Sequence, residues 1–485
     1  MLDMQKKLTA PFFAIMAMPA TAMGFALSVQ IAALSWLLRT KFDLEIEEIG
    51  LVWAAGPIAG ILGQVLIGII SDKVWFWGGR RRPFILIGGV LSSLSLLALP
   101  NIGVISSALG FEGVIAVALI VALLLDLSIN VSFNPTRAII ADLTPQGEKR
   151  TRGYTWMQSV SGTFGVLAYA IGAYFGNITL IYVGAGLVLL FSIIPTLLLD
   201  EPRTLSSDAE TASDASSDLG AIIAATRPLW AFFVYDLYAL GRRLAGIEPE
   251  TLIAEIACLV ATAGLIGHML LTDGKKRNTV EASNHEFRKI MAAHAFSWIG
   301  VQTMFVYFFA FAEFRFPGIE DDALGTVVAL SFLVLNAVAA VLPAAILGPM
   351  TTSRRRVHVH AGALMIMAIG YGLGYVFGGS VFAIYAIMGI LGVGWAAIVS
   401  LPFAIMSVRI DETRMGLYMG LFNLSVVLPQ LFVSMGVAVA VGQIADKGVV
   451  FLIGAASLAI SALLWLPVRK ADASVTETVV PPDGH

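Results

Sequence analysis

Charged residues are scarce in this chain of 485 amino acids. Asp, Glu, Lys and Arg make up 13% of it, whereas a soluble domain carries about a quarter, and 58% of its residues are hydrophobic. The mean hydropathy of +0.85 excludes an ordinary soluble protein and indicates an integral membrane protein in a lipid bilayer. The net charge of −3 does not indicate a nucleic-acid partner, and the basic residues are scattered among short loops instead of forming one patch.

Cysteine is almost absent, and the single Cys258 excludes an intramolecular disulfide and an all-cysteine metal site. The chain has no H-x-x-x-H pair, and Gly78-Gly79-Arg80 lacks the spacing of a phosphate-binding loop. We therefore expect no metal, no cofactor and no ATP-driven activity. No grouping of nucleophile, base and oxyanion donors emerges, so an enzyme is the least supported class of function.

Long apolar segments are abundant, and they form two sets of six that predict an all-α membrane protein. The first set comprises Pro11–Leu38, Ile49–Ile70, Phe84–Leu99, Gly113–Ile139, Tyr154–Phe175 and Leu180–Leu199. The second comprises Ile290–Phe314, Ala323–Leu347, Val357–Phe377, Val381–Met406, Gly416–Val441 and Val449–Val468. Between the sets lie Pro228–Leu240 and Thr251–Leu271, which we interpret as an added helix pair, the alternative being a hairpin at the membrane interface.

Lys and Arg gather in the loops that lie on the same side as both termini, which predicts that this side is cytoplasmic. Examples are Arg80–Arg82, Arg354–Arg356 and the segment from Lys149 to Arg152. We expect a multi-pass protein of the plasma membrane, the inner membrane in a bacterium, that acts as a monomer. Its predicted parts are an N-terminal six-helix bundle (1–199), a central linker with two added helices (200–288), a C-terminal six-helix bundle (289–468) and a cytoplasmic disordered tail (469–485).

The span Gly113–Ile139 carries an acid at its centre. A carboxylate at that depth costs roughly 2.5–3.5 kcal/mol on the insertion scale, so Asp126 is a functional candidate by default. Arg137 follows eleven residues later, almost three helical turns on, and Asn130 lies between them on the same face. We expect this stripe to face a protein interior or a water-filled cavity. A structural acid paired to another helix is the alternative for Asp126.

Several motifs resemble the plant sucrose–proton symporters and their animal and bacterial relatives, within the major facilitator superfamily. Trp53-Ala-Ala-Gly-Pro-Ile-Ala-Gly60 is similar to the W-x-x-GP-x-x-G of that family, and Gly79-Arg-Arg-Arg-Pro-Phe84 to its GRRRPF. Asp126, Arg137 and Asp142 match its LD…NN…P-x-RA-x-x-ADL pattern, although Ile129 replaces one asparagine.

The resemblance implies a major facilitator fold of two six-helix bundles and a proton-coupled importer of a disaccharide or related glycoside, of the sucrose or maltose type. Such a protein works by alternating access on a sugar and a proton, with Asp126 as the coupling acid. The alternatives are an efflux antiporter of the same fold and a non-transporting membrane assembly factor. Coupling to sodium in place of protons is also open.

Amide and indole side chains within spans are the expected sugar ligands, because hydroxyl groups need donors and acceptors and a sugar ring stacks on an aromatic face. For each of them, an interhelical hydrogen bond is the alternative. The predicted substrate-binding residues are Asp126, Asn130, Arg137, Gln30, Trp53, Gln64, Gln158, Trp298, Gln302, Asn423 and Gln430.

Charged residues at the cytoplasmic ends of the spans are candidates for a latch that closes that side. The alternative is that they only signal topology. These gating candidates are Asp72, Arg80, Arg81, Arg82, Asp142, Arg152 and Arg414.

Overall fold

The computed structural model describes most of the chain, and the described residues form helices. The described ranges are 3–60, 70, 74–111, 113–145, 148–202, 224–247, 249, 251–272, 279–342, 355–407 and 415–468. In these ranges the β pairing is confined to an isolated bridge between Phe76 and Gly79. The all-α prediction is therefore confirmed.

The helices of the first half are α1 (Asp3–Lys7), α2 (Ala10–Phe42), α3 (Ile46–Trp53), α5 (Arg82–Ala98), α6 (Ile102–Leu109), α7 (Ile115–Leu143), α8 (Glu148–Phe175) and α9 (Asn177–Leu198). The central region holds α11 (Trp230–Leu244) and α12 (Ile253–Leu271). The second half holds α13 (Thr279–Arg315), α14 (Asp321–Leu342), α16 (Arg356–Phe377), α17 (Val381–Ser407), α18 (Met415–Phe432), the π turn η6 (Val433–Val437), α19 (Ala438–Gln443) and α20 (Val449–Trp465).

Ten helices in the described ranges are long and apolar enough to cross a membrane, whereas the sequence predicts twelve core spans and an added pair. Helix α8 is not among them, because serines, glycines and Gln158 lower its hydropathy even after the charged first turns. Helix α20 is apolar but shorter, and α3 leads into a stretch outside the described residues.

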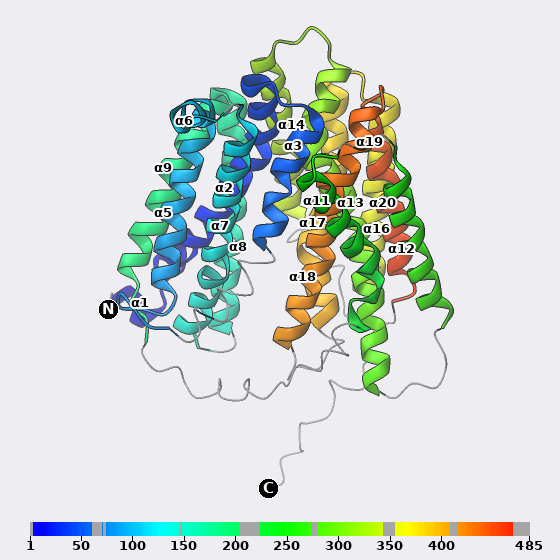
Figure 1. The fold of residues 1–485 in the computed structure, drawn as a ribbon. Helices are drawn as coiled ribbons and strands as arrows, with labels where there is room; N and C mark the ends of the chain where they lie inside the picture. The colour runs from blue at the N-terminus through cyan, green and yellow to red at the C-terminus, as the bar shows by residue number, and fades with distance from the viewer. Residues whose placement is uncertain are drawn as a thin grey trace.

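The helices pack as two bundles side by side (Figure 1). In the first, α2 lies against α7, α8 and α9, and α5 packs between α7 and α9. In the second, α13 packs against α18 and α20, while α17 contacts α14 and α16. Helix α14 also lies along α8, and this contact brings the two halves together around a shared interior.

The added helices α11 and α12 pack against each other and lie beside the second bundle (Figure 1). Helix α11 contacts α18 and η6, with Tyr235 edge-on to Phe432 at 5.1 Å between ring centroids. Helix α12 is apolar enough to cross a membrane by itself. Helix α11, with 15 residues, is not among the candidate spans.

Polar contacts join the two bundles at the end of the molecule where α2 finishes at Phe42. Arg39 pairs with Glu313 at 3.4 Å, and Lys41 pairs with Asp322 at 3.3 Å. The Trp36 indole nitrogen donates to the Asp321 carbonyl oxygen at 2.9 Å. We call this the Phe42 end; the opposite end carries Arg81.

Glycine allows α3 to approach the second bundle closely at the Phe42 end. A β-carbon on Gly50 would lie 2.7 Å from the Tyr307 hydroxyl, 2.9 Å from the Ala438 side chain and closer still to the Ser434 carbonyl oxygen. All three belong to the opposite bundle, so only a residue without a side chain fits this crossing.

Candidate functional site

A cavity of about 370 Å³ lies between the two bundles. Its polar lining comes from both halves of the chain, which places it where a transporter that rocks two bundles would hold its ligand. The volume falls within the roughly 300–1,000 Å³ typical of small-molecule pockets. The polar and aromatic residues that line it are Ser28, Gln30, Trp53, Asp126, Asn130, Phe133, Tyr169, Trp298, Gln302, Phe305, Asn336, Trp395, Asn423 and Gln430.

Asp126 is the acid of this cavity. It lies near the middle of α7, its exposed fraction is 4%, and its Oδ2 accepts a hydrogen bond of 3.0 Å from the Gln30 amide on α2. A β-carbon on Gly56 would come within 3.3 Å of the same oxygen, so a glycine there lets the chain after α3 approach the carboxyl. Asn130, one turn on, donates to the Asp126 carbonyl oxygen at 2.8 Å. Three chain segments therefore fix the position of this carboxyl.

The second bundle contributes amide side chains to its own wall of the cavity. Gln430 on α18 donates to the side-chain oxygen of Gln302 on α13 at 3.1 Å, and Asn423 lines the cavity two turns before Gln430. Each primary amide offers both donors and acceptors. The wall can therefore exchange its internal hydrogen bonds for bonds to a hydroxylated ligand.

Aromatic rings form a third part of the lining. Trp298 and Trp395 meet edge to face with their centroids 6.1 Å apart, and Phe305 lies edge-on to Trp395 at 5.3 Å. The Trp395 indole nitrogen donates to the Asn336 side-chain oxygen at 3.3 Å, and that of Trp298 donates to Nε2 of His294 at 3.0 Å. Because both indole nitrogens are bonded, the ring faces are held in fixed orientations.

Trp53 connects the cavity to the Phe42 end. Its indole nitrogen donates to the Ser35 hydroxyl at 2.9 Å, and Ser35 donates to the Val306 carbonyl oxygen at 2.8 Å. This chain of hydrogen bonds links the first bundle to the second beside the cavity.

A second polar cluster lies at the Arg81 end of the first bundle. The Arg81 Nε and Asp142 Oδ2 are 3.1 Å apart, with side-chain exposures of 9% and 11%. Glu201 accepts hydrogen bonds from the backbone N–H groups of Arg80, Arg81 and Arg82 at 2.6 to 3.1 Å, and a carboxylate is favourable at that start of α5. The cluster holds α5, α7 and the chain after α9 together.

Comparison with known proteins agrees with this architecture. The family model of the Major Facilitator Superfamily matches residues 17–434. The chain belongs to the major facilitator superfamily. The superfamily's members are membrane transporters, and the chain is accordingly a multi-pass transporter and not an enzyme.

Among curated relatives, this superfamily member is 26% identical to the sucrose transport protein SUC4 of Arabidopsis thaliana over 434 residues, which cover 81% of this chain and 78% of the relative. It is 33% identical over 138 residues to the general alpha-glucoside permease of Schizosaccharomyces pombe, covering 27% of this chain and 25% of that one. The resemblance to sucrose transporters seen in the motifs is confirmed.

Solved structures show the same fold at low sequence identity. The POT family transporter PepTSo superposes with a TM-score of 0.64 at 12% identity, covering 94% of this chain and 97% of that one. The inward-open xylose transporter XylE from E. coli gives a TM-score of 0.59 at 14% identity, with 95% and 96% covered. The predicted major facilitator fold is therefore confirmed.

The superfamily fold brings most of the predicted ligands together. Gln30, Trp53, Asp126, Asn130, Trp298, Gln302, Asn423 and Gln430 all line the cavity. Two predicted residues do not: Arg137 is exposed with its guanidinium 4.1 Å from the Phe133 ring centroid, and Gln158 is exposed on α8. Gln64 lies outside the described residues.

The structure adds lining residues that the motifs did not identify. Ser28, Tyr169, Asn336 and Trp395 face the same cavity, and each is a polar or aromatic residue inside an apolar span. Gln30 and Gln302 are predicted ligands because they are amide side chains inside apolar spans. Asn336 and Trp395 are an amide and an indole inside such spans, so the same criterion would have identified both.

The gating candidates divide in a similar way. Arg80, Arg81, Arg82 and Asp142 belong to the cluster around Glu201, whose contacts lie within the first bundle. Arg152 lies with its guanidinium 5.5 Å from the Phe13 ring centroid. Asp72 and Arg414 lie outside the described residues. Glu201 was not predicted, because an acid at the end of a span looks like any other solvated charge.

Proposed function

We propose that this transporter carries a disaccharide or related glycoside into the cell together with a proton. The observation that supports it most is the cavity lined by amides from both bundles, fixed indoles and one buried acid. The relatives named as transporters of sucrose and alpha-glucosides support the same class of substrate.

A sugar would bridge the bundles by replacing hydrogen bonds within each wall. Its hydroxyl groups would compete for Gln30 and Asp126 on one side and for the Gln302–Gln430 pair on the other. The faces of Trp298 or Trp395 would lie against the apolar face of the ring. Because contacts on both bundles are needed at once, binding favours the closed arrangement over either open one.

Asp126 would couple the proton to the sugar. A neutral carboxyl donates a hydrogen bond, whereas the ionised form only accepts. Proton binding therefore changes what Asp126 offers both to Gln30 and to a sugar hydroxyl. A charged, unpaired carboxylate in a closed apolar interior is unfavourable, so the bundles close more readily once the proton is bound.

The positive-inside rule supports an orientation with the Arg81 end and both termini in the cytoplasm of the plasma membrane, the bacterial inner membrane. The contacts at the Phe42 end would then close the outer side. In this orientation Arg80, Arg81, Arg82, Asp142 and Arg152 would lie on the cytoplasmic side, where we propose that they take part in gating. For Asp72 and Arg414 the same proposal rests on the sequence alone. We propose a working monomer built of the bundles 1–199 and 289–468.

The experiment that tests this function is transport of labelled sucrose and maltose in proteoliposomes. We expect saturable exchange, with the apparent KM raised about tenfold or more by Asn423→Leu, which removes one wall amide. Gln443→Leu is the matched control, because this amide lies outside the cavity and donates to the Pro249 carbonyl oxygen. If neither sugar moves, the glycoside assignment is wrong.

A further inference from the structure

A buried histidine lies directly behind the aromatic wall of the cavity between the bundles. His294 belongs to α13, its exposed fraction is 3%, and it does not line the cavity itself. Its Nε2 accepts a hydrogen bond of 3.0 Å from the indole nitrogen of Trp298, which follows one helical turn later and does line the cavity. His294 is therefore placed to act on the cavity through Trp298.

Two side-chain pairs hold α13 to α18 at this wall. The His294 ring stacks on Phe422 of α18, with the ring centroids 4.7 Å and the planes 14° apart. Gln302 and Gln430, which share a hydrogen bond, each lie eight residues further along their helices. The equal spacing means that the two helices run in the same direction with these pairs in register. Trp298 lies between the pairs, one turn from each, so its backbone is held on both sides.

The imidazole of His294 supplies an acceptor that determines where the indole N–H points. A ring nitrogen that accepts a hydrogen bond carries no proton, so the ring is neutral with its proton on Nδ1. The Trp298 N–H is an obligate donor, and it is already bonded to His294. It is therefore not available to a hydroxyl group of a ligand, and Trp298 offers the ligand the face of its ring.

Packing alone does not account for a histidine at this position. Nδ1 of His294 is buried and has no hydrogen-bond partner among the described residues. An unpaired polar atom inside a membrane-spanning bundle is unfavourable, and a phenylalanine would stack on Phe422 without that cost. The hydrogen bond to Trp298 is what the imidazole provides and a hydrocarbon ring does not.

The orientation of Trp298 determines the shape of the aromatic wall. Its ring plane stands at 88° to that of Trp395, so the two indoles form a corner that faces the cavity. Trp395 is held separately by its hydrogen bond to Asn336. Rotation of the Trp298 side chain would change the angle of the corner, and the bond to His294 opposes that rotation.

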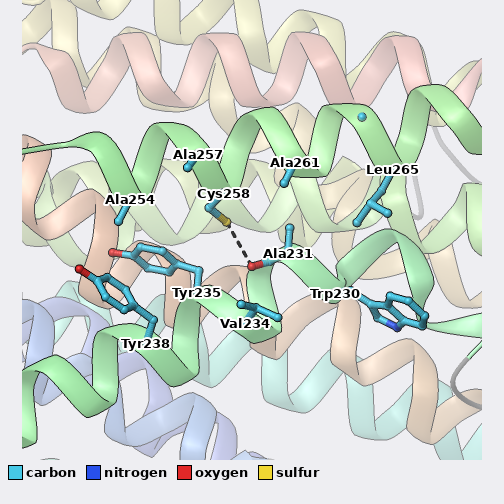
Figure 2. Close-up of a pocket in the computed structure, with 11 residues that line it drawn as sticks. Trp230, Ala231, Val234, Tyr235, Tyr238, Ala254, Ala257, Cys258, Ala261 and Leu265 are labelled. Carbon is cyan, nitrogen blue, oxygen red and sulfur yellow. Dashed lines mark hydrogen bonds between the residues drawn. The ribbon is translucent and has the colours of Figure 1, made fainter.

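Trp230 provides a comparison outside this cavity. It lines the groove between α11 and α12 (Figure 2), and 40% of it is exposed. Its indole nitrogen also donates to a side chain one turn earlier, the Thr226 hydroxyl, at 3.4 Å. Water can replace that acceptor at an exposed position, whereas the acceptor of Trp298 is buried. Trp230 therefore serves as an internal reference for the hydrogen bond of Trp298.

We propose that His294 is a positioning residue, which holds the Trp298 indole so that its ring face meets the substrate. The inference rests on the proposed function for what the ring binds, while the hydrogen bond itself is measurable without any substrate. This wall then selects ligands that present an apolar ring face, as a sugar does, and recognition of hydroxyl groups is left to the amides.

The first measurement is the NMR spectrum of the indole N–H groups in the purified full-length protein without sugar. The resonances lost in Trp298→Phe and in Trp230→Phe identify the two indoles. His294→Phe keeps a ring against Phe422 but removes the acceptor, so the Trp298 proton should move to lower chemical shift while that of Trp230 stays. His294→Gln keeps an acceptor without a ring and should restore most of the shift. A Trp298 resonance that does not move in His294→Phe would overturn the proposal.

The second measurement is exchange of labelled sugar in proteoliposomes. His294→Phe should raise KM about fivefold with little change in the maximal rate, the effect of losing one ordinary hydrogen bond that orients a binding group, and His294→Gln should recover most of the affinity. His360→Phe is the matched control and should leave KM unchanged, because it removes a buried imidazole of the same bundle that meets Trp465 edge-on.

A double variant separates positioning from a direct effect of His294 on the sugar. Trp298→Phe has no indole N–H to hold, so adding His294→Phe to it should not raise KM further. A rise by the same factor in both backgrounds would overturn the proposal. If the unmodified protein moves neither sugar, the glycoside assignment fails, and the NMR result alone decides whether His294 positions Trp298.

Discussion

Replacing Gly50 by alanine should open the Phe42 end. The added methyl group would meet the Ser434 carbonyl oxygen, the Tyr307 hydroxyl and Ala438, all in the second bundle. Overpacking of this kind costs about 1–3 kcal/mol, and it is relieved when the bundles separate at this end. At 1.4 kcal/mol per tenfold change, the ratio of closed to open molecules should fall roughly 5- to 140-fold.

Distances between spin labels at Ser107→Cys and Glu320→Cys, one on each bundle, report this change. Both positions are exposed, and Cys258→Ala removes the native thiol. Gly362→Ala is the matched control, because a β-carbon there has no neighbour within 4 Å while the gain in helix propensity is the same. We expect a longer-distance population in Gly50→Ala and none in the control. If the two distributions coincide, the Gly50 crossing does not hold this end closed.

Three further predictions concern stability and affinity. Arg81→Leu leaves Asp142 buried without its ion-pair partner, so it should lower the free energy of unfolding by about 3 kcal/mol in thermal denaturation, and Asp142→Leu added to it should recover most of the loss. Glu201→Gln should cost about 1 kcal/mol in the same assay, because an amide oxygen caps α5 without the charge; no change would show that the cap is not stabilising. Gln302→Leu removes the acceptor of the Gln430 amide and should raise the KM for sugar about tenfold with little change in stability; an unchanged KM would remove this pair from the sugar site.

The bundle architecture was predictable because the membrane imposes it. A helix that crosses a bilayer must be long and apolar, so spans such as α7 and α14 are visible in the sequence without knowledge of their packing. Asp126 was visible for the opposite reason, since an acid in the middle of such a span is exceptional. Polar side chains inside spans face a protein interior or a water-filled cavity and not lipid. The sequence could therefore predict that Asp126, Gln30 and Gln302 share a cavity.

The positions that a linear pattern does not determine are those that depend on helix rotation and on partners far along the chain. Arg137 follows Asp126 by eleven residues, yet it lies exposed over Phe133 outside the cavity. Glu201 binds the start of α5 through a contact about 120 residues away in sequence, which no local spacing indicates. The packing of α11 against α18 depends on side-chain fit, so the position of this helix could not be predicted.

The coupling role of Asp126 is the central claim, and uptake by Asp126→Asn tests it most directly. Proteoliposomes with an imposed inward proton gradient should accumulate labelled sucrose or maltose above equilibrium, and a protonophore should abolish the accumulation. In Asp126→Asn, which keeps the shape of the side chain and a group for Gln30 to contact, accumulation should be lost while binding of the sugar persists. Gradient-driven accumulation at the unmodified level in Asp126→Asn would contradict the account.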